Sequence, residues 1–189
     1  MKRRSLGLNI IKDKSRIDMT AIKLKGNILD VGIRNYGIIY KLCKQNEDEV
    51  AVEYVMDEER EFISDKCYDS VVLFFSLGQL NNSKARRQLF KEIDKYVSDS
   101  GEIFLWEVNK AVGEMLDLDI EVIMPGNEAQ NIKLQYLNPM KKLSMIEIKS
   151  MVMHYFDIID EKEEACFFYL RGKRKQKEKI IDESSIDCT

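Results

Sequence analysis

The stretch GNILDVGIRNYGIIYKL, residues 26–42, joins a short apolar run to glycines and then to a helical pattern. Residues 27–31 are apolar apart from their ends, which is typical of a strand covered on both faces. Residues 36–45 repeat apolar side chains at helical spacing, so a helix is expected after the strand. The glycine-containing loop 32–37 between them is either a binding loop for a nucleotide-type ligand or only a tight strand-to-helix connection.

The rest of the chain alternates between strand and helix patterns. Further strands are expected at residues 50–55, 70–75, 102–108, 156–161 and 165–171. A long amphipathic helix is expected behind Ser83, taken as its N-cap residue, and a second helix behind the capping box Ser144 to Glu147. Short strand-helix-strand intervals imply right-handed crossovers, and the charged joint between the last two strands permits only an antiparallel pair. We therefore predict an α/β fold with a mostly parallel sheet, helices on both faces and an antiparallel C-terminal edge hairpin.

The length of 189 residues is that of one domain with a small appendage. Two strand-like runs, 120–124 and 132–137, flank a Pro-Gly-Asn turn and predict an inserted hairpin. Residues 173–189 mix basic and acidic side chains with too little apolar surface to order on their own. We predict a single domain at 1–172, in which 118–138 is an inserted hairpin that serves as a lid, followed by a flexible charged tail.

Charge and composition argue against several classes of protein. The net charge of −3 results from 30 basic and 33 acidic side chains, so neither nucleic acid nor an anionic membrane is expected as a partner. The 4 cysteines lie far apart without a Cys-x-x-Cys pair, so no metal site and no disulfide framework is expected. The N-terminal apolar run is too short for a secretory signal, and no segment approaches the roughly 20 apolar residues of a membrane-spanning helix. A cytoplasmic location is expected.

Several segments together carry a family resemblance. Residues 27–32 resemble the opening motif of class I S-adenosylmethionine-dependent methyltransferases, in which an apolar strand ends in an acidic residue followed by glycine. Met56-Asp57 looks like the acidic adenine contact of that family, and residues 68–72 look like the start of its fourth strand. Residues 74–80 take the place of its cofactor-flanking loop, and residues 91–107 are similar to its helix, Pro-Gly-Gly-like turn and fifth strand.

The resemblance covers about residues 20–172 and implies a three-layer Rossmann-like fold with S-adenosyl-L-methionine as the cofactor. It implies that Gly32 and Gly37 pass close to the methionine part of the cofactor, with Asp30 near the amino group. Glu53 or Asp57, taken from two alternative alignments of one strand, would contact the ribose hydroxyls or the adenine.

Phe75, Ser76 and Leu77 would line the sulfonium side of the cofactor by the same resemblance, because aromatic faces favour a positive sulfur. Plain core packing is the alternative for Phe75. Glu107, at the carboxyl end of the strand 102–108, is the candidate catalytic residue, as a substrate contact or a base.

Two departures from the family pattern stand in this sequence. Arg34 and Tyr36 interrupt the alternating glycines that normally follow the acidic residue. The interval from Asp30 to Asp57 also holds one helix and one strand, where the family normally has two of each. These features describe a shortened or degenerate member of the family.

The sequence therefore predicts a methyltransferase that acts by positioning its cofactor and a methyl acceptor, which is either a small molecule or of an unidentified kind. The alternative is a catalytically inactive methyltransferase-like domain that serves as a binding or scaffold module. A nicotinamide-dependent oxidoreductase is the weaker third reading, because the Gly-x-Gly-x-x-Gly motif is absent from the sequence. The oligomeric state does not follow from the sequence.

Overall fold

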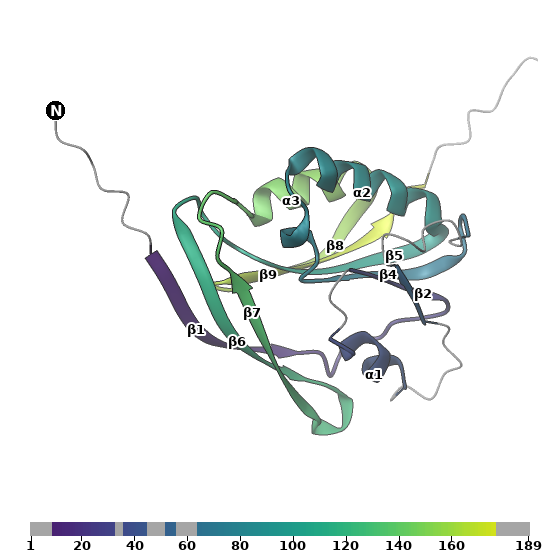
Figure 1. Cartoon of the computed structure of the whole chain (residues 1–189). Coiled ribbons are helices and arrows are strands. Elements are labelled where there is room, and N and C mark those ends of the chain that lie inside the picture. Colours follow the sequence, from purple (N-terminus) through teal and green to yellow (C-terminus); the bar gives the residue numbers. More distant parts are fainter. Residues whose placement is uncertain (1–8, 33–35, 45–51, 56–63, 177–189) are drawn as a thin grey trace, which may run out of the picture.

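The computed structural model describes residues 9–32, 36–44, 64–176 and the backbone of 52–55, which form two β-sheets and three α-helices (Figure 1). The larger sheet has six strands in the order β3-β2-β4-β5-β9-β8. These strands are β2 (Ile28–Val31), β3 (Val52–Val55), β4 (Tyr68–Phe74), β5 (Val97–Val108), β8 (Phe156–Glu163) and β9 (Phe167–Arg174).

Strand direction is mixed in this sheet. β2 pairs in parallel with β3 and with β4, and β4 pairs in parallel with β5. β9 runs antiparallel to both of its neighbours, β5 and β8. The predicted α/β class is confirmed, and the strands expected from residues 27 to 171 are all present, but β5 begins at Val97 rather than at residue 102, where a turn was expected to precede the strand.

Helices cover the larger sheet on both sides (Figure 1). The helices are α1 (Ile38–Lys44), α2 (Ser83–Tyr96) and α3 (Met145–Val152), and a short 3-10 helix, η2 (Leu77–Gln79), follows β4. Asn82 rather than the predicted Ser83 caps α2, because its side chain accepts from the Ala85 amide at 2.9 Å. Ser83 instead donates to Glu147 Oε1 at 2.5 Å, which ties α2 to α3. Ser144 caps α3 as predicted.

A second sheet contains β1 (Asn9–Asp18), β6 (Glu114–Ile123) and β7 (Ala129–Tyr136), in the order β1-β6-β7. The predicted hairpin corresponds to the antiparallel pair β6 and β7. The sequence analysis did not identify β1, because its inward-facing positions 11, 13, 15 and 17 include only two aliphatic side chains. Its parallel pairing with β6 supplies the backbone hydrogen bonds that order this segment.

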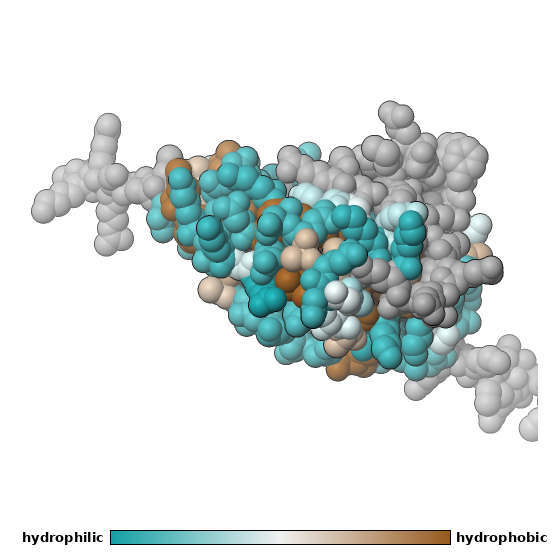
Figure 2. Space-filling model, turned by 90° about the horizontal axis from the view of Figure 1, so that it is seen from below, coloured by the Kyte–Doolittle hydropathy of each residue, from teal (hydrophilic) through white to brown (hydrophobic). Residues whose placement is uncertain are grey.

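The outer face of the smaller sheet is largely hydrophilic (Figure 2). Cross-strand ion pairs cover it: Arg16 lies 3.5 Å from Glu121, and Lys133 lies 3.5 Å from Asp117. The two charges of each pair compensate each other on neighbouring strands.

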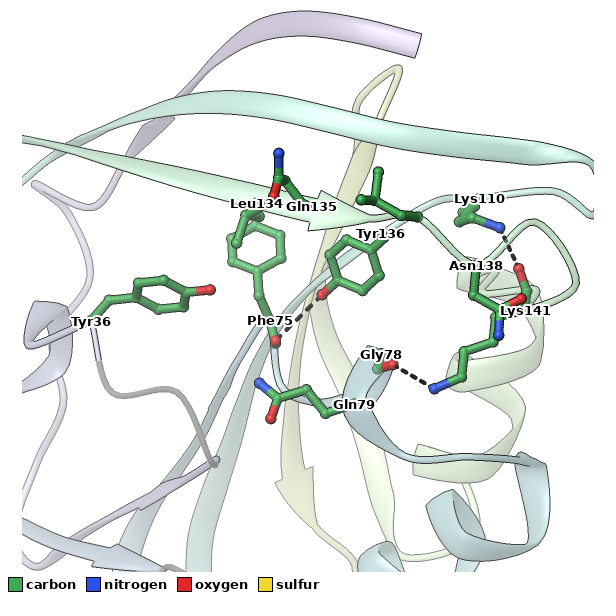
Figure 3. A pocket seen from close by; sticks show the side chains of 11 residues that line it. Tyr36, Phe75, Gly78, Gln79, Lys110, Leu134, Gln135, Tyr136, Asn138 and Lys141 are labelled. Atoms are coloured by element: carbon green, nitrogen blue, oxygen red, sulfur yellow. Dashed lines mark hydrogen bonds between the residues drawn. The ribbon is translucent and has the colours of Figure 1, made fainter. Parts of the chain in front are cut away.

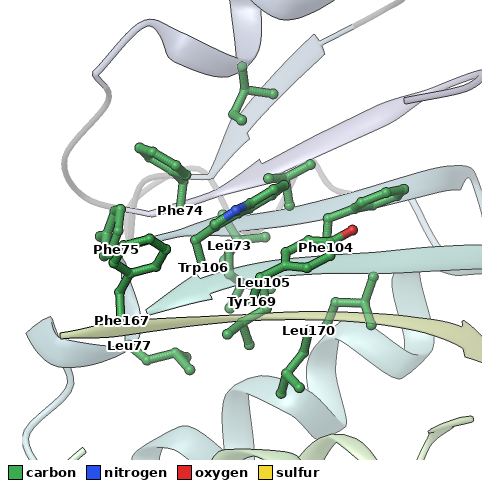
Figure 4. Close-up of a cluster of buried hydrophobic side chains, with 14 of the residues drawn as sticks. Leu73, Phe74, Phe75, Leu77, Phe104, Leu105, Trp106, Phe167, Tyr169 and Leu170 are labelled. Carbon is green, nitrogen blue, oxygen red and sulfur yellow. The ribbon is translucent and has the colours of Figure 1, made fainter. Parts of the chain in front are cut away.

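The core of the molecule is aromatic on one face of the larger sheet (Figure 4). The Trp106 ring packs on Tyr169 at a centroid distance of 4.7 Å and on Phe74 at 5.8 Å. All three residues are buried, so these rings join β4, β5 and β9 into one packed unit.

The tail was predicted to begin at residue 173, but β9 continues past that position. β9 extends to Arg174, whose side chain is buried and donates to Asp94 on α2 and to the Val97 carbonyl. Pairing with a carboxylate and carbonyl oxygens allows this arginine to be buried. Most of the predicted tail, residues 177–189, lies outside the described residues. No helix in the described part of the chain is long and apolar enough to cross a membrane.

Candidate functional site

The parallel strands β2 and β4 are neighbours, so their carboxyl ends meet at one edge of the sheet. Gly32 directly follows β2, and Ser76 follows β4 after one residue. A Cβ atom at Gly32 would lie 3.1 Å from the Cβ atom of Ser76, which is closer than such atoms usually approach. Glycine at this position therefore lets the two strand ends come together.

Two polar side chains at this edge have no partner among the described residues. The Asp30 carboxylate on β2 makes no hydrogen bond or ion pair there, and burial raises its pKa from 3.8 to about 7. The Ser76 hydroxyl is buried and has no hydrogen-bond partner. Ser76 is buried and Asp30 is partly buried. A polar group that loses water without gaining a partner costs free energy, about 1–3 kcal/mol when it is fully buried, so both groups are suited to bind a ligand that supplies donors or positive charge.

Gly37 and Glu53 are two further predicted cofactor residues whose backbone the structure describes. Gly37 adopts a φ of +68° directly before α1, a conformation that favours glycine, and nothing lies within 4 Å of a Cβ added there. Glu53 lies on β3 opposite Leu29 of β2. Asp57 and Arg34 lie outside the described residues.

Phe75 lies at the turn between β4 and η2, and its φ of +52° is unusual for a residue with a side chain. Its amide donates to the Trp106 carbonyl at 2.9 Å, which continues the pairing of β4 with β5 beyond the strand end. Leu77, two residues further, is fully buried in the core. A strained backbone held by its surroundings is a common feature of binding sites.

Glu107, the predicted catalytic residue, is enclosed by the protein. Its side chain is fully buried and accepts from the amides of Gly78 and Val108 at 3.0 and 2.9 Å, and from the Tyr136 hydroxyl at 2.8 Å. Burial raises the pKa of this carboxyl, and these hydrogen bonds oppose the rise. The carboxylate therefore does not reach the surface, and Tyr136 lies between it and the neighbouring cavity.

That cavity has a volume of about 440 Å³ and opens between η2, β7 and the loop after β7 (Figure 3). Phe75, Gly78 and Tyr136 form part of its wall. A Cβ atom at Gly78 would lie 1.9 Å from the Tyr136 ring, so this glycine lets the ring lie flat against η2. The Tyr136 hydroxyl also lies 3.3 Å from the Phe75 carbonyl oxygen.

Tyr36, which interrupts the family glycine pattern, lies on the opposite wall of this cavity (Figure 3). Its ring packs edge-on against Phe74 at a centroid distance of 6.2 Å. Gln130 on β7 donates to the Tyr36 carbonyl at 2.8 Å and accepts from Lys41 on α1 at the same distance. The loop after β2 is thus fastened to the smaller sheet, and its tyrosine becomes part of the cavity.

Sequence reasoning singled out only Tyr36 and Phe75 among the residues that line the cavity. Gly78 and Tyr136 lay within the predicted loop 74–80 and hairpin 118–138 without a role of their own, and Lys110 and Lys141 were missed. The alternation of apolar residues in the strand 132–137 could have placed Leu134 and Tyr136 on one face. No local signal could have shown that this face lies over η2, because that contact joins segments far apart in the chain.

No protein-family model and no curated protein matches the sequence. Solved structures do match its fold. An S-adenosylmethionine-dependent methyltransferase from Mesorhizobium loti superposes with a TM-score of 0.54 at 9% identity, over 82% of this chain and 94% of that chain. The chain has a class I methyltransferase-like fold. This confirms the family resemblance at the level of the fold.

Two further solved structures resemble this class I methyltransferase-like fold. The PH0226 protein from Pyrococcus horikoshii OT3 has a TM-score of 0.53 at 14% identity, over 83% of this chain and 85% of that chain. The cyclase SpnF has a TM-score of 0.54 at 11% identity, over 82% of this chain and 77% of that chain. Because one of these proteins is named as a cyclase, the class I methyltransferase-like fold does not define one reaction, and the site must carry the functional argument.

Proposed function

We propose that this protein is an S-adenosylmethionine-dependent methyltransferase that acts on a small-molecule acceptor. The observation that carries the proposal is the pair of polar groups, Asp30 and Ser76, at the adjoining ends of β2 and β4, which have no partner among the described residues. In parallel sheets this edge is where ligands bind. The amino group of the cofactor is a cation that would satisfy Asp30, so the residues present fit the group.

The cofactor supplies a methyl group on a positively charged sulfur. Asp30 would hold the ammonium of its methionine part, and Ser76 would offer a hydroxyl beside it. Gly32 and Gly37 would let the backbone lie close to the cofactor, and Glu53 or Asp57 would contact the ribose or adenine. Phe75 and Leu77 follow the same strand, and Phe75 would separate the cofactor from the acceptor.

The acceptor would bind in the cavity next to Phe75. Tyr136 would touch the acceptor, and Glu107 would contribute by accepting the hydrogen bond that orients Tyr136. We propose that the segment 118–138, which contains all of β7 and the end of β6, acts as the specificity element of a single domain spanning residues 1–172. Positioning of this kind is the main requirement of methyl transfer.

Calorimetric titration with S-adenosylhomocysteine tests the cofactor site. We expect saturable binding by the wild-type protein and weakening of about 10- to 100-fold in Asp30→Asn, the loss typical of a charge-assisted hydrogen bond. Affinity should also fall as pH decreases through about 7, because only the ionised carboxylate binds the ammonium. Asp119→Asn, at an exposed position on β6, is the matched control and should bind normally.

Equal binding by the wild-type protein and Asp30→Asn would contradict the assignment of Asp30. Absence of binding by the folded wild-type protein would overturn the methyltransferase proposal. The inactive binding module would then be favoured, since Tyr36 stands where the family has glycine and packs into the wall of the cavity.

A further inference from the structure

The cavity beside Tyr136 contains two lysine side chains at one end, Lys110 and Lys141 (Figure 3). We propose that this cavity binds a small planar carboxylate, with its anionic group held by these two ammonium groups. If the bound carboxylate is the methyl acceptor, the inference rests on the proposed function. The binding itself requires no methyl transfer and can be measured separately.

Lys110 is almost fully buried just beyond β5, with a relative exposure of 2%. Its backbone is fixed by a bridge to Leu143, with N-to-O distances of 2.7 and 3.0 Å. Its ammonium donates to the carbonyl oxygens of Lys141 at 2.5 Å and of Ala111 at 3.3 Å. Burial lowers the pKa of this lysine, and the more distant charge of Glu114 acts in the opposite direction. The ammonium is thus held by backbone carbonyls, and no carboxylate in the described part of the chain forms an ion pair with it.

Lys141 reaches back across the cavity to η2 (Figure 3). Its ammonium lies 3.3 Å from the Gly78 carbonyl and 3.5 Å from the Leu80 carbonyl, and both are long for hydrogen bonds. Of the ion pairs formed in the described part of the chain, none involves Lys110 or Lys141. Each ammonium has three N–H donors, so both retain capacity for an anion.

The remainder of the cavity suits a flat, weakly polar body. The rings of Tyr36, Phe75 and Tyr136 lie on its walls, and Gln79 and Asn138 add amide groups. A volume of about 440 Å³ falls in the range of small-molecule sites, which combine apolar walls with a few polar groups. Two partly desolvated positive charges at one end of aromatic walls are best compensated by an aromatic carboxylate.

The next lysine in the sequence provides a natural comparison. Lys142 is exposed and does not line the cavity, as expected for an ordinary solvated lysine. Lys110 and Lys141 instead direct their ammonium groups at backbone carbonyls around the cavity. The contrast between adjacent residues 141 and 142 gives a matched pair of variants with the same chemical change.

The test is ligand-observed NMR titration with benzoate and with benzamide, its neutral analogue of nearly equal shape. We expect benzoate to bind the wild-type protein at least 5-fold more tightly than benzamide. Lys141→Met keeps most of the apolar stem and should weaken benzoate binding about 5- to 10-fold, as expected for loss of one charged hydrogen bond. Lys142→Met should change it less than 2-fold.

Equal affinity for benzoate and benzamide in the wild-type protein would overturn the proposal, and this comparison does not depend on the folding of any variant. Equal effects of Lys141→Met and Lys142→Met would also overturn it. Titration of the same samples with S-adenosylhomocysteine separates the two proposals. Loss of benzoate preference with intact S-adenosylhomocysteine binding refutes the carboxylate site alone, and the reverse result refutes the cofactor site alone.

Discussion

Two carboxylates lie near the carboxyl ends of strands in the same sheet, and their surroundings are opposite. Glu107 on β5 accepts hydrogen bonds from two backbone amides and the Tyr136 hydroxyl. Asp30 on β2 has no such partner among the described residues. Burial raises the pKa of both, so burial alone does not distinguish them. The two carboxylates differ in the number of hydrogen-bond donors that the described residues supply to them.

This difference separates a structural carboxylate from a candidate ligand contact. The donors around Glu107 belong to the protein itself. By accepting their hydrogen bonds, the glutamate holds η2 and β7 against the end of β5. Asp30 and Ser76 find no hydrogen-bond partner among the described residues, so they are available to a ligand or to solvent. The following predictions test this contrast.

The largest expected effect is the loss of the Glu107 side chain. Glu107→Ala would leave two buried amides and a hydroxyl without their acceptor and should lower the free energy of unfolding by about 3–5 kcal/mol. Urea denaturation of this variant beside Glu121→Ala, an exposed control on β6, measures the effect. A cost below about 1 kcal/mol would mean that Glu107 does not hold this region together.

Asp30→Asn should change the free energy of unfolding in the opposite direction and stabilise the protein above neutral pH. The folded pKa of Asp30, about 7, lies above its ordinary value of 3.8, so its contribution to stability is complete below about pH 4 and is lost as pH rises through 7. At about pH 8 the asparagine variant should therefore be more stable than the wild type, by up to about 4 kcal/mol for a shift of three pKa units. The difference should shrink towards zero near pH 4.

Urea denaturation of both proteins at these two pH values measures this difference. A pH-independent difference would show that folding does not raise the pKa of Asp30, and the contrast with Glu107 would fail.

Ser76→Ala should have the smallest effect on stability. Removing a buried hydroxyl without a partner should raise the free energy of unfolding by about 0.5–1 kcal/mol, because its desolvation cost disappears. Ser70→Ala is a useful comparison, since the Ser70 hydroxyl is buried but hydrogen-bonded to the backbone of Lys25, and its loss should destabilise. Destabilisation by both substitutions to the same extent would indicate a hidden partner for Ser76.

The residues around the cavity show which features local sequence patterns can predict and which they cannot. The turn glycines, the strand after residue 27 and the acidic residue at position 30 were recognisable because strand and helix periodicity is a local property. Lys110, Gly78 and Tyr136 were not recognisable as a group. They come from three separate segments, and no spacing rule relates them.

By itself, the sequence determined the α/β class, most of the strands and helices, and the family resemblance, because hydrophobic periodicity and turn residues act over a few neighbouring positions. Tertiary structure decided which carboxylate is satisfied. Glu107 and Asp30 are both acidic residues near strand ends. The packing of β7 over η2 brings the Gly78 amide and the Tyr136 hydroxyl to Glu107, whereas no described residue donates to Asp30. Two of the three donors to Glu107, from Gly78 and Tyr136, come from distant parts of the chain, so this distinction exists only once the chain has folded.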